Sequence, residues 1–239
     1  KKFAMVSSVT YNKFGDLKMG SNGPEEYLRT EYVSRNFIID SVIANEDPEV
    51  QVPSGYKQLN LMQKLRYKPN KHWDINYGFI YSETSDYPRY DRYIQYADND
   101  TLKFGQWDYG PQIWSMNNLN VEYTKENNFF DEASFRVSRQ YFKESRISRK
   151  FRKTKKEEKT EQVWAYSANF DFHKTINEKN QLFYGAEWVL NDVNSEAFEF
   201  DSESGLYDQI ASRYPQSNWN SIALYTTYSS KITPDLRLN

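Results

Sequence analysis

The chain has 239 residues, with 31 Lys and Arg against 33 Asp and Glu, and a formal net charge of −2. This balance produces no global field that would point to nucleic acid. The absence of cysteine excludes a disulfide framework and a thiolate metal site. Mean hydropathy is low at −0.91, yet 17% of the residues are aromatic. Amphipathic side chains in this number require a surface to lie against.

Period-two alternation of apolar and polar residues recurs along the chain and predicts strands. The clearest case runs from Trp73 to Tyr81, where every second residue is aromatic or Ile. No apolar run reaches the length of a transmembrane helix, so a membrane role would have to use strands. The predicted strands, in chain order, are 3–14, 56–68, 72–84, 112–124, 132–150, 158–175, 181–197 and 217–230, and a ninth begins near Leu236.

Short and long connections alternate between these strands. The short ones are 69–71, 126–131, 176–180 and 231–235, and the long ones are 15–55, 85–111 and 198–216. This alternation is typical of a transmembrane barrel with tight periplasmic turns and long extracellular loops. The connection after Lys150 is short, but its two strands are long enough for the hairpin itself to project outward.

A soluble up-and-down barrel or a solenoid is the alternative for this pattern. A soluble barrel would place its apolar residues inside and use strands of about 5 to 10 residues. The strands here are longer and carry aromatics near the predicted rims, such as Trp73 and Trp188, which favours a membrane barrel.

At Gln106–Gln112 and Gln140–Arg146 the chain resembles TonB-dependent receptors of Bacteroidota, in the haemoglobin, transferrin or lactoferrin receptor-like branch. Residues 14–20, 85–91, 184–187 and 212–215 are similar to the same branch. The resemblance implies an all-β fold, an antiparallel up-and-down β-barrel of 22 strands in the cell outer membrane, plugged by an N-terminal domain. Residues 1–239 would then be a fragment, one partial barrel domain of about eight or nine strands, without the plug and the remaining strands.

The loop 85–111 carries the candidate ligand-binding residues. Their rings could stack on a planar siderophore or haem, and their guanidinium groups could neutralise its carboxylates. Alternatively, these aromatics fold the loop on itself or pad the outer rim. The candidates are Tyr87, Arg89, Tyr90, Arg92, Tyr93, Trp107 and Tyr109.

Other polar residues have simpler interpretations. The basic run 149–156 is predicted at a hairpin tip, where it either attracts anionic ligands and lipopolysaccharide phosphates or is merely solvated. His72 and His173 lie beside predicted periplasmic turns, as solvent-facing or plug-contacting side chains. Four strand residues are predicted to face a wet lumen: Arg136, Asn169, Asp171 and Glu187.

These observations predict a receptor fragment that imports a scarce nutrient, an iron complex such as a siderophore or haem. The partners implied by the resemblance are outer-membrane lipid and lipopolysaccharide, and a TonB-type energy-coupling protein acting through the missing plug. No catalytic motif, cofactor site or metal site is recognisable, so an enzyme is not expected. Two alternatives stay open: an importer of oligosaccharide or peptide, and an adhesion barrel that binds a partner without transport.

Overall fold

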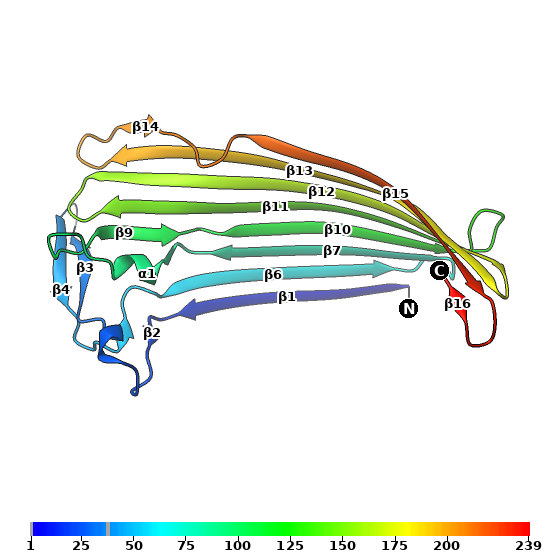
Figure 1. Ribbon diagram of the computed structural model, residues 1–239, viewed down its shortest axis with the longest axis horizontal. Helices are drawn as coiled ribbons and strands as arrows, with labels where there is room; N and C mark the ends of the chain where they lie inside the picture. Colours follow the sequence, from blue (N-terminus) through cyan, green and yellow to red (C-terminus); the bar gives the residue numbers. More distant parts are fainter. Residues whose placement is uncertain (1, 37–38) are drawn as a thin grey trace.

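The computed structural model describes residues 2–36 and 39–239. One antiparallel sheet dominates it, with strand order β1-β6-β7-β10-β11-β12-β13-β15-β16 (Figure 1). Each of these strands pairs with the next one in chain order, which confirms the predicted up-and-down fold class. The strands are β1 (Phe3–Phe14), β6 (Tyr56–Tyr67), β7 (Trp73–Thr84), β10 (Ile113–Thr124), β11 (Glu132–Lys150), β12 (Lys155–Asn177), β13 (Asn180–Asp201), β15 (Ser217–Lys231) and β16 (Arg237–Leu238).

All eight predicted strands are present, and most of their ends agree with prediction within a residue. The hairpin of β12 and β13 is longer than predicted at the long-loop end. There β12 begins three residues earlier, and β13 ends four residues later, than the sequence predicts. Paired charges support this extension where apolar alternation has stopped: Lys155 Nζ lies 2.6 Å from Glu199 Oε1 across the two strands. Within the described ranges, no helix is long and apolar enough to cross a membrane.

The long connections contain regular structure that the sequence pattern did not predict. They gather at one end of the sheet, which we call the long-loop rim, together with the tight turn between β11 and β12. The other tight turns form the opposite short-turn rim (Figure 1). The additional elements are β2 (Leu17–Lys18), η1 (Glu25–Tyr27), β3 (Glu31–Asn36), β4 (Ile39–Ala44), β5 (Val50–Gln51), β8 (Tyr87–Pro88), α1 (Tyr90–Tyr93), β9 (Phe104–Tyr109) and β14 (Tyr207–Gln209).

Strand β9 extends the main sheet beyond β10, toward the long-loop rim. It pairs with the upper part of β11, from Tyr109 opposite Arg146 to Phe104 opposite Lys150. The break between β9 and β10 falls at Gly110, whose φ of +110° favours glycine. A Cβ atom at Gly110 would also lie 2.9 Å from the carbonyl oxygen of Ser85. The strand interruption therefore depends on this glycine.

The register separates the sheet into two faces of opposite character. The apolar face carries Trp73, Ile75 and Tyr77 of β7, directly opposite Tyr123, Val121 and Leu119 of β10. On that face Val9, Ile222 and Leu224 are 73%, 76% and 82% exposed. Exposed apolar side chains in this number indicate contact with another apolar phase. The few buried apolar residues, Tyr93, Leu102, Ile147 and Ala197, lie toward the long-loop rim.

The polar face carries the side chains predicted to line a lumen. Arg136, Asn169 and Glu187 occupy one rung across β11, β12 and β13, and Asn169 Nδ2 donates to Glu187 Oε2 at 2.8 Å. Asp171 lies on the same face, two residues along β12. The predicted common orientation of these four residues is therefore found in the structure.

Candidate functional site

An array of aromatic rings lines the polar face at the long-loop rim. Ring centroids are 4.7 Å apart for Phe14 and Tyr56, 5.9 Å for Tyr56 and Tyr87, and 5.6 Å for Tyr87 and Tyr109. Trp107 contacts Tyr109 edge-on at 5.2 Å. Strand pairing explains this alignment, because Phe14 lies opposite Tyr56 and Tyr87 lies opposite Tyr109. Residues from three parts of the sequence thus form one continuous surface.

Three arginines lie against these rings. Arg89 donates from Nη1 to the hydroxyl of Tyr109 at 2.7 Å, and its Cζ is 5.2 Å from the Trp107 centroid. The Cζ of Arg146 is 5.2 Å from the Tyr109 centroid, and that of Arg92 is 5.7 Å from Trp107. We call these residues the rim cluster: Phe14, Tyr56, Tyr87, Trp107, Tyr109, Arg89, Arg92 and Arg146.

The rim cluster keeps hydrogen-bonding capacity available to a ligand. The side chains of Arg89, Arg92 and Arg146 remain 32%, 37% and 30% exposed. The Nε atoms of Arg92 and Arg146 are buried and have no hydrogen-bond partner among the described residues. Those two Nε atoms are not accessible to a ligand, but the exposed parts of the three stacked guanidinium groups are suited to a carboxylate, phosphate or phenolate oxygen.

Two carboxylates partly balance the arginines. Asp91 Oδ1 accepts from Arg89 Nε at 2.8 Å, and Glu144 Oε1 is 3.9 Å from Arg146 Nε. Burial, with Glu144 nearby, raises the pKa of Tyr87 to about 12. Tyr87 therefore stays neutral and contributes a ring face and a hydroxyl rather than a negative charge.

The structure separates the seven predicted ligand residues. Tyr87, Arg89, Arg92, Trp107 and Tyr109 meet in the rim cluster, so the loop folds on itself, yet it still presents arginines and rings on the polar face. Whether they contact a ligand stays a prediction.

Tyr93 and Tyr90 lie outside the rim cluster. Tyr93 is 6% exposed, and its hydroxyl donates to Asp108 Oδ1 at 2.8 Å on the other side of β9. Tyr90 lies beside Arg29, whose Cζ is 6.0 Å from its ring, in a separate hollow. The sequence pattern missed Phe14, Tyr56 and Arg146, whose only signal is their position near strand ends at the same rim.

The sequence leaves two interpretations open for the basic run 149–156, attraction of anionic ligands or simple solvation, and Arg149 fits neither because it is buried. Arg149 is 4% exposed and Asp40 is 3% exposed. Arg149 Nη1 donates to Asp40 Oδ2 at 2.5 Å, and Nη2 donates to Oδ1 at 2.8 Å. The backbone N–H of Arg152 also donates to Asp40 Oδ2, at 2.7 Å. The β3–β4 hairpin is thereby fixed to the turn between β11 and β12.

The charge state of Asp40 follows from these contacts. Burial alone would raise the pKa of Asp40, but hydrogen bonds from Arg149 and from the Arg152 N–H outweigh it and hold the pKa below the ordinary value of 3.8. Asp108, which faces Tyr93, has the opposite balance: burial raises its pKa despite hydrogen bonds from Gln106 and Tyr93.

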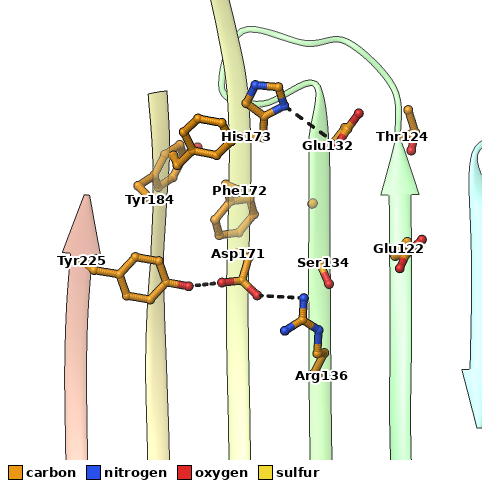
Figure 2. A pocket seen from close by; sticks show the side chains of 12 residues that line it. Glu122, Thr124, Glu132, Ser134, Arg136, Asp171, Phe172, His173, Tyr184 and Tyr225 are labelled. Atoms are coloured by element: carbon orange, nitrogen blue, oxygen red, sulfur yellow. Dashed lines mark hydrogen bonds and ion pairs between the residues drawn. The ribbon is translucent and has the colours of Figure 1, made fainter. Parts of the chain in front are cut away.

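A second polar hollow lies near the short-turn rim (Figure 2). Asp171 accepts a hydrogen bond from the hydroxyl of Tyr225, and its Oδ2 is 3.8 Å from Arg136 Nη2. His173 Nδ1 is 3.9 Å from Glu132 Oε2, and His173 Nε2 is buried without a hydrogen-bond partner among the described residues. His72 Nδ1 is 2.7 Å from the carbonyl oxygen of Thr124. Both histidines lie at the short-turn rim, as predicted.

Comparison with solved structures shows which fold this sheet shares. The chain aligns over 99% of its length with a copper transporter, OprC, at a TM-score of 0.60 and 9% identity. It aligns over 98% of its length with the ferric yersiniabactin uptake receptor FyuA from Yersinia pestis, at a TM-score of 0.50 and 14% identity. The chain spans 31% and 33% of those two chains. At these identities the likeness shows a common fold.

No protein-family model matches the sequence, and no curated protein matches it.

Proposed function

We propose that this chain is part of the wall of a TonB-dependent receptor in the outer membrane, which imports a scarce nutrient, an iron complex such as a siderophore or haem. The observation that carries the proposal is the rim cluster, an array of rings and arginines on the polar face at the rim of a sheet whose opposite face is apolar. The shared fold with a copper transporter and a ferric yersiniabactin uptake receptor supports it.

The proposed function predicts what each face and each rim of the sheet contacts. The apolar face contacts lipid, the polar face lines the lumen, and the long-loop rim is extracellular. The polar hollow of Arg136, Asp171 and His173 then faces the periplasmic half of the lumen, where a plug domain would lie. In this proposal a complete receptor also has a plug domain, further strands and a contact with an energy-coupling protein.

The rim cluster suits a ligand that is both flat and anionic. Aromatic faces at 5 to 6 Å spacing offer stacking area, and the exposed guanidinium groups offer charge-assisted donors to oxygen. Haem, with its carboxylates, and catecholate or phenolate siderophores share both properties. A neutral oligosaccharide would stack on the rings but would offer no anionic group to the arginines.

The test uses the complete receptor expressed in a strain that lacks it, with uptake of defined iron sources under iron limitation. We expect the variant R89A/R146A to raise the half-saturating concentration roughly tenfold or more, since a hydrogen bond to a charged group contributes about 1.5–3 kcal/mol. The matched control is R213A, an arginine stacked 4.8 Å from the Tyr214 centroid in the long loop 198–216. Surface abundance and heat-modifiable mobility would verify barrel assembly.

Three results would contradict the proposal. Unchanged uptake in R89A/R146A would remove the rim cluster from ligand binding. Growth that depends on an oligosaccharide or peptide but not on iron would replace the substrate class. A complete gene without a plug domain and energy-coupling box would favour an adhesion barrel.

A further inference from the structure

A hollow of about 550 Å³ lies in the polar face of the sheet, between the rim cluster and the short-turn rim. We call it the midwall hollow. Among the described residues that line it, none is Asp or Glu. Its charged and amide side chains come from β6, β7, β10 and β11: Lys64, Arg66, Asn76, Asn118, Asn120 and Arg136. A polar lining of cations and amides favours an anionic group.

Gly78 opens the floor of the midwall hollow. It lies on β7, directly between Lys64 of β6 and Asn118 of β10. A Cβ atom added at Gly78 would meet no neighbouring atom within 4 Å, so the position is an open recess and not a tight contact. Glycine inside a strand often marks a place where a ligand approaches the backbone closely.

The side chains on either side of Gly78 are available to an anion. Lys64 is exposed, and within the described ranges the side chains of Lys64 and Asn118 have no hydrogen bond or ion pair. Arg136 is 56% exposed, and its ion pair with Asp171 is long at 3.8 Å (Figure 2). Lys64 therefore places an uncompensated charge in the hollow, with an amide donor nearby.

Three carboxylates lie on the short-turn side of the midwall hollow, and each already accepts a hydrogen bond. They are Asp74, which accepts from Arg66, Glu122, which accepts from Asn120, and Asp171, which accepts from Tyr225. These carboxylates repel an anion from the short-turn side. The favourable position for an anion is therefore between Lys64 and Asn118, over Gly78.

The midwall hollow is separate from the rim cluster. Lys64 is eight residues along β6 from Tyr56, which is a rise of roughly 19 Å at ~3.3 Å per residue and ~45° tilt. The next rung of the polar face toward the rim cluster consists of Met62, Ile80 and Met116, which offer no hydrogen-bond donor to an anion. Two cationic sites thus lie along one wall, with an apolar step between them.

The size of the midwall hollow favours a small molecule as its occupant. One carboxylate side chain would fill only a small part of 550 Å³, whereas small-molecule sites have volumes of ~300–1,000 Å³. We infer that the midwall hollow is a second binding site for a carboxylate or phenolate ligand, whose anionic group Lys64 and Asn118 hold after the ligand leaves the rim cluster. The order of the two sites rests on the proposed function, but anion binding at Lys64 does not.

The first test measures anion binding at Lys64 in the complete protein, purified in mild detergent. The probe is salicylate, which carries a carboxylate and a phenolic oxygen, and the matched control is the uncharged salicylamide. Acetylation of each lysine by N-hydroxysuccinimidyl acetate is followed by mass spectrometry. We expect salicylate at about ten times its Kd to slow acetylation of Lys64 roughly tenfold, since protection follows 1 + [L]/Kd. Salicylamide should not slow it, and neither compound should protect Lys179, which is exposed in the turn after β12.

A variant that fills the recess tests the position of the site. The Cβ atom of G78V would meet no neighbouring atom, so the sheet should assemble while salicylate no longer protects Lys64. If G78V fails to assemble, N118A serves instead and should also reduce protection. Equal protection by salicylate and salicylamide, or equal protection in the variant and the wild type, would overturn the inference. Resistance of Lys64 to acetylation without any probe would also overturn it, because another part of the complete protein would then occupy the hollow.

The second test separates passage of the ligand from its capture. In cells under iron limitation, supplied with a defined iron source that the wild type imports, we expect K64Q to lower the maximal uptake rate roughly tenfold at an unchanged half-saturating concentration. K64R should keep the wild-type rate, as should the matched control K57Q, which removes an exposed cation from the opposite face of the same strand. Equal rates for K64Q and K57Q would overturn the role in passage. If the wild type imports no iron source, the proposed function fails, while protection by salicylate still decides whether the midwall hollow binds an anion.

Discussion

The buried pair of Asp40 and Arg149 permits a quantitative prediction for the β3–β4 hairpin. In Asp40→Asn the Arg149 guanidinium, whose side chain is 3% exposed, would lose its counter-charge. Removing one partner of a buried ion pair costs about 3–5 kcal/mol. An isolated two-stranded hairpin is at best marginally stable, so the loss should appear as local opening of residues 31–36 and 39–44.

The predicted magnitude follows from the exchange of backbone amides. Since about 1.4 kcal/mol corresponds to a factor of ten, we expect exchange in these two strands to accelerate at least a hundredfold in D40N. Hydrogen exchange with mass spectrometry on the complete protein measures this directly. The inner long strands β6, β7, β10, β11, β12 and β13, which are paired on both sides, should be unaffected.

Two further variants test the reasoning. The control D47N removes the exposed partner of Lys18 in the same loop, where the ion pair is solvated, and should leave exchange unchanged. The double variant D40L/R149M removes both buried charges of the Asp40–Arg149 pair, while Arg35, 3.2 Å from Asp40 Oδ1 and partly exposed, stays accessible to water; this variant should recover part of the protection lost in D40N. If D40N and D47N exchange alike, the pair does not hold the hairpin.

Two other predictions concern the same contact. The depressed pKa of Asp40 means that its stabilisation is complete above the unfolded value, about 3.9, and is lost as pH falls through the lower folded value. Exchange of residues 31–36 and 39–44, corrected for the intrinsic rate, should therefore stay constant from pH 7 to about 4 and rise below it. In Gly105→Ala the new Cβ would lie 2.6 Å from Arg149 Nη2 and from Asp40 Oδ2, so G105A should expose the hairpin to proteolysis, whereas G20A, with nothing within 4 Å of its Cβ, should not.

The long strands could be predicted from the sequence because their two faces meet different environments. Alternation around Trp73 and Tyr81 is strong, and the tight turns are bounded by polar residues. The strand β9 is harder to predict from the sequence. Gln106 and Asp108 lie on one side of it, Trp107 and Tyr109 lie on the other, and loop residues cover both sides. Alternation in the sequence predicts a strand only where one side of the strand faces solvent or lipid. At the long-loop rim, tertiary contacts decide which side chains are covered.

The site residues show the same limit. Arg149 belongs to a run of basic residues that the sequence places at an exposed hairpin tip, either solvated or attracting anions, yet it is buried against Asp40, which is 109 residues away. Tyr93 resembles the other loop aromatics in sequence, but the turn of α1 directs it to Asp108 and away from Trp107. Which member of a charged or aromatic cluster is buried depends on contacts with residues that are distant in the sequence.

In the orientation given by the proposed function, the Asp40–Arg149 pair also determines which surface the long-loop rim presents to other molecules outside the cell. It joins the β3–β4 hairpin, the turn after β11 and Gly105 into a surface assembled from three distant parts of the sequence. Recognition of that surface by an antibody or a phage tail protein would therefore be conformational, and no short peptide cut from the chain would reproduce it.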